Sequence, residues 1–269
     1  MLKNKNIFII AEAGINHNGN FKTAIKLAKA AKKAGANAIK FQTYKTERRV
    51  KKNNPAFDVL KKCELNYKEF VKIKDYCDHI GIEFFSTPFD KEAVDFLSKI
   101  KVKKYKISSF DISNYELINK ILEKKKFTII STGMASLQEI KKVNTIFNKK
   151  KINHCILHCI SSYPNIEENS YLANIRFLKD KLNVEIGLSD HTPDINTSKI
   201  AYLMGVKIIE KHFKLSKTHR CIDSPVSITP EQLNSLRNSL NNYAKIIGKP
   251  KFGIKNIEKP ARIFKRKFI

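Results

Sequence analysis

Several features that would place this chain in a common structural class are missing. It has only five cysteines in 269 residues, and no two of them form a CxxC pair. We recognise no signal peptide and no apolar run near 20 residues, which argues against a secreted or membrane-spanning protein. The glycine fingerprint GxGxxG of dinucleotide-binding folds is also absent. These absences predict a cytoplasmic protein with reduced thiols and no membrane partner.

Acidic residues are scarce relative to basic ones, and the formal net charge is +27. A nucleic-acid-binding protein is expected to cluster its basic residues and to interleave aromatic ones. Here the lysines are spread over almost every expected helix, as in KLAKAAKKAG. We therefore interpret the charge as compositional bias on solvated helix faces and expect no specific nucleic-acid partner.

Short apolar runs rich in β-forming residues alternate with longer segments of helical periodicity. The expected strands are 7–13, 38–44, 83–87, 104–109, 127–132, 154–160, 184–189 and 207–212. The expected helices lie near 21–34, 67–80, 91–99, 115–125, 137–149, 171–182, 195–204 and 230–247. Eight such units in a chain of this length predict an α/β fold, a single-domain TIM (β/α)8 barrel, which typically needs ~250 residues. An open, doubly wound sheet is the alternative.

Local signals support the helix boundaries. Ser136 and Thr229 each begin a capping-box pattern, and Pro230 follows Thr229 at the first helical position. Glycines stand where helices are expected to end, at Gly35, Gly81, Gly205 and Gly248.

The barrel is expected to occupy residues 1–250, followed by a basic tail over 251–269. Residues 45–66 form the one long connection, which is basic and polar. Because it follows the second strand, it is expected on the C-terminal face of the barrel, where lids usually lie.

Polar side chains recur at the C-terminal ends of the expected strands, the place where barrel enzymes hold their active sites. They are Glu12, Asn16, Lys40, Gln42, Ser86, Thr87, Lys106, Ser108, Ser109, Asp111, Ser131, Thr132, Ser161, Tyr163, Ser189, Asp190, His191, Glu210 and His212. Two of them are lysines, which we expect on adjacent strands, and many carry hydroxyls. This combination suits a phosphate and a carboxylate.

Two histidines, His191 and His212, end the seventh and eighth strands. Neighbouring strands are ~4.8 Å apart, so both imidazoles can reach one divalent ion such as Mn²⁺, Zn²⁺ or Co²⁺. The sequence HCILHC at 154–159 looks similar to a metal cluster, but on a strand His154 and His158 are about 13 Å apart. One metal ion cannot bind both, so we expect its cysteines to be packing residues.

Eight motifs in order resemble the sialic acid synthase family, and the resemblance spans about 12–260. They are AEAGINHNG at 11–19, IKFQTY at 39–44, FFSTPF at 84–89, YKISSFD at 105–111, STGM at 131–134, HCISSYP at 158–164, GLSDHT at 187–192 and IEKHF at 209–213. The resemblance implies a barrel enzyme that condenses phosphoenolpyruvate with an N-acetylated amino-sugar aldehyde, such as N-acetylmannosamine. The products would be a 2-keto sugar acid and phosphate.

The resemblance also implies roles for individual residues. His191 and His212 would bind the metal ion, most often Mn²⁺, with Mg²⁺ or Co²⁺ possible. Phosphoenolpyruvate would be held by Lys40, Thr87, Lys106, Ser109, Ser161 and Ser189. Near the metal, the sugar or the reacting carbons would lie Glu12, Gln42, Asp111, Tyr163 and Asp223. Of these, we expect Glu12, Asp111 and Asp223 to be catalytic, and either Glu12 or Asp111 could handle the attacking water.

The chain also departs from the family pattern. The family usually carries a C-terminal antifreeze-like domain that, in a homodimer, covers the partner's active site and contributes an arginine. The motifs end before such a domain, so we expect none. This expectation weakens that of a homodimer and leaves a barrel with binding but little activity as one alternative. Ser109-Phe110-Asp111 and Asp223-Ser224 look more like pseudaminic acid synthases, which act on a 6-deoxy diacetamido hexose. A barrel aldolase for a phosphorylated sugar would need more arginines than Arg48, Arg49 and Arg220.

Overall fold

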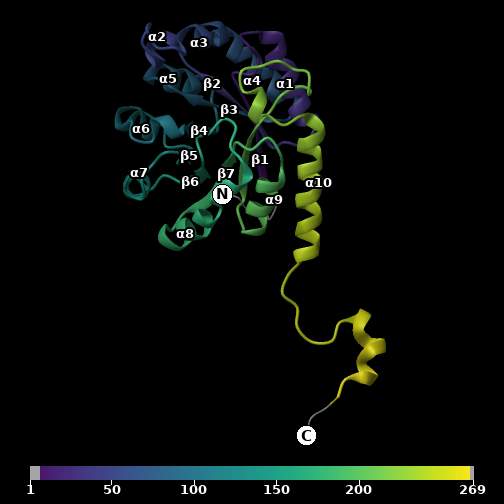
Figure 1. Ribbon diagram of the computed structural model, residues 1–269. Helices are drawn as coiled ribbons and strands as arrows, with labels where there is room; N and C mark the ends of the chain where they lie inside the picture. Colours follow the sequence, from purple (N-terminus) through teal and green to yellow (C-terminus); the bar gives the residue numbers. More distant parts are fainter. Residues whose placement is uncertain (1–6, 267–269) are drawn as a thin grey trace.

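The computed structural model describes residues 7–266, and its centre is a closed barrel of eight parallel strands in chain order (Figure 1). Every strand pairs in parallel with the next, and β8 pairs with β1 to close the ring. The predicted TIM barrel is confirmed, and the open sheet is excluded. The strands are β1 Phe8–Gly14, β2 Ala38–Thr43, β3 Glu83–Pro88, β4 Lys104–Ile107, β5 Phe127–Ser131, β6 His154–Cys159, β7 Glu185–Asp190 and β8 Ile208–His212.

Helices surround the barrel, and each expected helix is present. They are α1 Phe21–Lys33, α4 Tyr67–Ile80, α5 Lys91–Lys99, α6 Tyr115–Leu122, α7 Leu137–Lys149, α8 Ala173–Lys181, α9 Asn196–Leu203 and α10 Pro230–Ile247. The capping boxes at Ser136 and Thr229 form as predicted, and Asn66 begins a third. Gly81 ends α4 in the left-handed conformation, with φ of 69°, which a glycine adopts without strain.

The barrel interior has an apolar lower part and a polar upper part. Ile10, Phe85, Ile129 and Ile208 pack together inside the ring. Side chains alternate across a strand, so the residue two positions further along the strand points to the same side. The interior positions above this apolar plug are therefore Glu12, Thr87, Ser131 and Glu210, which places polar groups over a water-excluding base.

The connection over 45–66 is more ordered than the sequence suggested. It contains two short helices, α2 Thr46–Arg49 and α3 Phe57–Cys63, where we expected an irregular loop. Leu60 and Cys63 pack with Ile15 and Tyr44 in a small separate apolar cluster. This cluster fixes the connection over the C-terminal face of the barrel, as predicted for its position.

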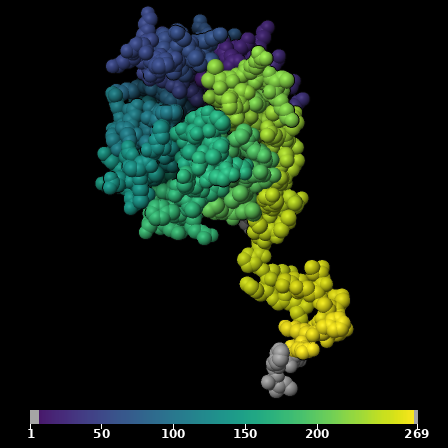
Figure 2. All heavy atoms as spheres, in the orientation of Figure 1, coloured from purple at the N-terminus to yellow at the C-terminus, as the bar shows by residue number. Residues whose placement is uncertain are grey.

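The segment after α10 leaves the barrel (Figures 1 and 2). It contains a 3-10 helix, Asn256–Phe264, with no buried side chain. The last residues of the predicted tail, 267–269, lie outside the described residues, as do residues 1–6. Among the described helices, none combines the length and apolarity that crossing a membrane requires.

Candidate active site

A cavity of about 240 Å³ opens at the C-terminal ends of the strands, at the polar end of the barrel. It is lined by Glu12, Ile15, Lys40, Gln42, Arg49, Thr87, Phe89, Lys106, Ser108, Ser109, Phe110, Ser131, Cys159, Tyr163, Ser189, His191, Glu210, His212 and Asp223. We call the strand residues at its base the floor (Glu12, Lys40, Lys106 and Glu210). We call the groups around its opening the mouth (Arg49, Tyr163, His191, His212 and Asp223).

The floor is a buried cluster of alternating charges. Lys40 Nζ lies 2.8 Å from Glu12 Oε2 and 3.5 Å from Glu210 Oε2. Lys106 Nζ lies 3.5 Å from Glu210 Oε1. All four residues are at most 4% exposed. Buried charges are costly unless they are paired. The two carboxylates therefore stabilise the charged form of the lysines when no ligand is bound.

One expectation about the floor was wrong. Lys40 and Lys106 do not lie on adjacent strands, because β3 separates β2 from β4. The lysines are instead linked across the barrel by Glu210 on β8, whose two carboxylate oxygens face one ammonium group each. This arrangement places two cations in the lining of one small cavity.

Hydroxyl groups complete the floor. Lys40 Nζ donates to Thr87 Oγ1 over 3.0 Å, and Lys106 Nζ donates to Ser131 Oγ over 2.6 Å. Ser189 Oγ donates to Glu210 Oε1 over 2.9 Å. These hydroxyls form hydrogen bonds with the charged groups, and they line the cavity in which an anion could bind.

Gly133 brings two further serines together. Its backbone N–H donates to Ser109 Oγ over 2.9 Å. A Cβ on Gly133 would collide with Ser161 Oγ, so only glycine fits between the two serines. Ser161 Oγ is buried and has no hydrogen-bond partner among the described residues. An unsatisfied buried hydroxyl is costly, and a ligand oxygen would satisfy it.

The two histidines predicted as metal ligands do lie side by side at the mouth. Their ring centroids are 5.3 Å apart, and the Tyr163 ring lies 4.1 Å from His191 and 5.8 Å from His212. His191 Nδ1 lies 2.7 Å from the carbonyl oxygen of Ile160 and therefore donates its proton there. That tautomer leaves the lone pair of His191 Nε2 free.

Asp223 reaches the mouth from the segment after β8. Its Oδ2 lies 3.3 Å from His212 Nδ1, and its backbone N–H donates to Asn16 Oδ1 over 3.0 Å. A Cβ on Gly14 would be 3.3 Å from both Asp223 Oδ2 and Glu12 Oε1. Gly14 has a φ of 52°, so this end of β1 suits glycine, which lets the two carboxylates approach the same point.

The donor set fits a divalent cation. His212 Nδ1 is buried without a hydrogen-bond partner among the described residues, and His191 Nε2 offers a free lone pair. Within residues 7–266, no three His, Cys, Asp or Glu side chains already form a compact metal cluster. Two imidazoles would therefore hold the ion, with water and ligand oxygens completing its shell.

The carboxylates and lysines differ in their pKa shifts. Burial raises the pKa of Glu12, although Lys40 opposes this shift. Burial also favours a raised pKa for Glu210, but Lys106 and Lys40 outweigh it and hold that pKa low. Burial lowers the pKa of Lys106, because fewer carboxylates lie close to it than to Lys40. Glu12 is thus the floor carboxylate that accepts a proton most readily.

Asp111 does not line the cavity. It belongs to a short 3-10 turn, Ser109–Asp111, where Ser108 Oγ donates to its Oδ2 over 2.6 Å and Asn114 Nδ2 donates to its Oδ1 over 3.3 Å. Its carboxylate holds the turn that presents Ser109. The other residues that were given a role line the cavity, except Ser161, which lies against Gly133. Four of the further polar residues expected at the strand ends do not line it: Asn16, Ser86, Thr132 and Asp190.

Several lining residues had no role in the sequence analysis. Glu210 was noted only as polar, yet it bridges both lysines. Its signal was its spacing two residues before His212, on the same side of the strand. Arg49 and Phe89 had no such signal, because neither belongs to a regular strand position.

The interpretation of HCILHC as packing residues agrees with the structure. His154 lies 2.8 Å from Asn144 Oδ1 through Nε2, and His158 Nε2 lies 2.7 Å from the carbonyl oxygen of Ser170. Cys155 is buried in the apolar interior of the barrel. Cys159 differs, because it lines the cavity beside His191.

Comparison with known proteins supports the resemblance. Residues 27–252 match the model of the NeuB family. The chain is 35% identical to the N,N'-diacetyllegionaminic acid synthase of Legionella pneumophila, over 97% of this chain and 79% of the relative. It is 34% identical to the pseudaminic acid synthase of Campylobacter jejuni, over 97% of this chain and 81% of the relative.

The fold agrees with a solved structure of the same kind. The N-acetylneuraminic acid synthetase of Leptospira borgpetersenii serovar Hardjo-bovis, in complex with citrate, superposes with a TM-score of 0.92 at 38% identity. The match covers 97% of this chain and 91% of the other. Because the family model matches most of the chain and these relatives are more than 30% identical to it, this chain belongs to the NeuB family.

Proposed function

We propose that this protein condenses phosphoenolpyruvate with an N-acetylated amino-sugar aldehyde, such as N-acetylmannosamine or a related sugar. The products are a 2-keto sugar acid and inorganic phosphate. The single observation that carries the proposal is the floor. Two buried lysines line one small cavity together with the hydroxyls of Thr87 and Ser131. Such a site suits a small ligand with a phosphate and a carboxylate.

In this proposal, phosphoenolpyruvate lies on the floor. Lys40 and Lys106 hold its negative groups, and the unpartnered Ser161 Oγ and the neighbouring Ser109 hold its oxygens. Glu12 and Glu210 form ion pairs with the lysines, and each lysine would then interact with both a carboxylate and the ligand. A raised pKa suits Glu12 to accept a proton during the reaction itself.

The sugar aldehyde lies above, at the mouth. Carbon 3 of phosphoenolpyruvate attacks the aldehyde carbon, and water adds at carbon 2. The bond between carbon 2 and the phosphate oxygen then breaks and releases phosphate. Glu12 is placed to stabilise the positive charge that develops at carbon 2 and to take the proton from the water. We favour Glu12 over Asp111 for this role, because the Asp111 carboxylate is held in its turn.

His191 and His212 would hold a divalent cation, and we propose Mn²⁺ as the physiological ion. When bound there, the cation supplies Lewis acidity to the aldehyde oxygen. Asp223 contacts His212 and, with Tyr163, limits where the sugar can lie. The five cysteines are free thiols, which fits a cytoplasmic location.

Phosphate release by the purified protein tests the function. Phosphoenolpyruvate and Mn²⁺ are supplied with N-acetylmannosamine or with diacetamido hexoses in parallel, and product masses are read by mass spectrometry. We expect sugar-dependent phosphate release and a product whose mass is that of phosphoenolpyruvate plus sugar plus water minus phosphoric acid. Failure to bind phosphoenolpyruvate would remove the basis of the proposal.

A further inference from the structure

Arg49 is an unusual member of the cavity wall because it is a cation supplied by the connection after β2 and not by a strand. Its guanidinium carbon lies 3.7 Å from the ring centroid of Phe89 and 4.7 Å from that of Tyr44. Its Nη1 donates to Gln42 Oε1 over 2.9 Å. The guanidinium is thus held between aromatic rings, and its position beside the cavity is defined.

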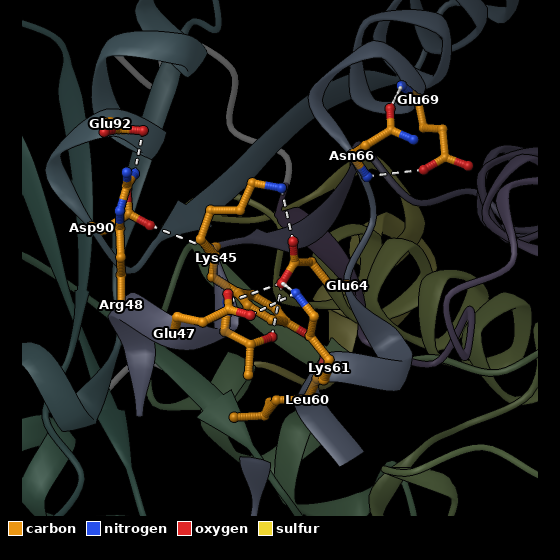
Figure 3. Close-up of polar contacts among 12 residues, drawn as sticks. Lys45, Glu47, Arg48, Leu60, Lys61, Glu64, Asn66, Glu69, Asp90 and Glu92 are labelled. Carbon is orange, nitrogen blue, oxygen red and sulfur yellow. Dashed lines mark hydrogen bonds and ion pairs between the residues drawn. The ribbon is translucent and has the colours of Figure 1, made fainter. Parts of the chain in front are cut away.

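The short helix α2 that carries Arg49 is anchored on its other sides (Figure 3). Glu64 accepts hydrogen bonds from the backbone N–H and the hydroxyl of Thr46, both over 2.9 Å. Lys61 Nζ lies 2.8 Å from Glu47. Arg48 points away from the cavity and pairs with Glu92 at the start of α5. These contacts leave the last residue of α2, Arg49, directed at the mouth.

Arg49 lacks a carboxylate partner within ion-pair distance among the residues that the structure describes. A guanidinium has five N–H donors in a planar fork, and one of them is used by Gln42. Most of the side chain is removed from water, which lowers the pKa of Arg49. Its remaining donors lie at the wall of the cavity, where a ligand oxygen can take the place of water.

We propose that Arg49 binds an oxygen of the amino sugar, either a hydroxyl or the N-acyl carbonyl, and so helps determine which sugar is accepted. The floor lysines already serve the anionic ligand, and Arg49 contacts Gln42, two positions beyond Lys40 toward the mouth. Phe89 adds an apolar surface beside the guanidinium, which suits the edge of an acylated sugar. This proposal rests on the proposed function and deepens it.

The test compares Arg49→Ala and Arg49→Lys with Arg48→Ala. The control removes a neighbouring arginine and an anchor of the same helix without touching the cavity wall. We expect Arg49→Ala to raise the KM for the sugar about 10- to 100-fold, the effect of losing a charge-assisted hydrogen bond. The KM for phosphoenolpyruvate is expected to stay unchanged. Arg49→Lys should recover part of the loss, because lysine keeps the charge but lacks the planar fork.

Two kinetic results would overturn the role of Arg49. One is an Arg49→Ala protein whose KM for the sugar equals that of the wild type. The other is a KM for phosphoenolpyruvate that rises as much as that for the sugar, which would assign Arg49 to the anion. Calorimetric titration of the sugar into the Mn²⁺- and phosphoenolpyruvate-loaded protein gives an independent readout. A wild-type protein that binds phosphoenolpyruvate but no amino sugar overturns the proposal for Arg49 and the acceptor part of the function. Normal sugar binding and turnover by Arg49→Ala overturns the Arg49 proposal alone.

Discussion

The floor and the mouth of the same cavity are built in opposite ways. The floor consists of four strand residues that are almost fully buried and that neutralise one another. The mouth consists of residues at strand ends and in connections, and Tyr163 is 45% exposed. The difference teaches that the two ends have separate tasks. The floor is made of strand residues and could serve any barrel that binds phosphoenolpyruvate. The mouth contains residues from connections, so substitutions in these connections could change which second ligand binds.

The largest effect is expected from removing one charge of the floor, because its four charged groups neutralise one another. Lys40→Met leaves the buried Glu12 without its 2.8 Å partner. Leaving a buried charge unpaired costs about 3–5 kcal/mol, so we expect a loss of that size in the free energy of unfolding. Urea denaturation measures it, and phosphate release is expected to disappear as well.

Two further variants sharpen the result. Lys104→Met breaks the pair with Glu83 on the same barrel, where both side chains are 19% exposed, and should cost less than about 1 kcal/mol. The double variant Lys40→Met with Glu12→Gln removes both partners and should regain much of the stability, without activity. If Lys40→Met is no less stable than Lys104→Met, the floor is not the coupled charge cluster described here.

At the mouth, the larger expected effect is on metal binding. His212→Ala should weaken Mn²⁺ binding by about 100-fold or more, since even the loss of a group that only orients a ligand costs 10- to 100-fold. Its thermal stability should fall less than that of Lys40→Met, because the 3.3 Å contact of His212 Nδ1 with Asp223 Oδ2 is longer and less buried than the pair of Lys40 with Glu12. Electron paramagnetic resonance of Mn²⁺ titrations measures the affinity.

His79→Ala is the matched control for that experiment, because His79 lies exposed on α4, away from the cavity. It should bind Mn²⁺ like the wild type. Equal Mn²⁺ affinity in all three proteins would show that the ion binds elsewhere and would leave the two histidines without a metal role.

The smallest expected effect concerns the acid sensitivity of the helix that carries Arg49. Burial tends to raise the pKa of Glu64, but its hydrogen bonds from Lys45 and Thr46 outweigh this and lower the pKa to about 2 (Figure 3). A lowered carboxyl pKa stabilises the fold above the unfolded-state value near 4.5, and this stabilisation fades as the pH falls toward about 2.

Glu64→Gln should therefore cost about 1 kcal/mol at pH 7, a value discounted for the partial exposure of the group. The difference from the wild type should shrink between pH 4.5 and pH 3, as measured by urea denaturation. Glu47→Gln, which removes an exposed partner of Lys61, should have little effect at either pH. A Glu64→Gln difference that is constant with pH would refute the ionic anchoring of α2.

Much of the fold could be predicted because barrel strands and helices carry strong local signals. The alternation at β8 placed Glu210 and His212 on one side of the strand, and the capping boxes at Ser136 and Thr229 fixed two helix starts. The two short helices at 46–49 and 57–63 carried too few residues for a periodic pattern. Their stability comes from contacts such as that of Thr46 with Glu64, which is distant in the chain.

The sequence by itself determined the barrel, the polar strand ends and the paired histidines, because strand alternation and parallel order send those side chains to one face. Only the tertiary structure decided which of these side chains form ion pairs with one another and which lie outside the cavity. Glu210 bridges lysines from two strands that are not neighbours, and Asp111 is bound within its own turn. Arg49 enters the cavity wall only because its helix is anchored by Lys61, Glu64 and Glu92, which belong to other parts of the chain. Such contacts depend on three-dimensional packing, which no local pattern encodes.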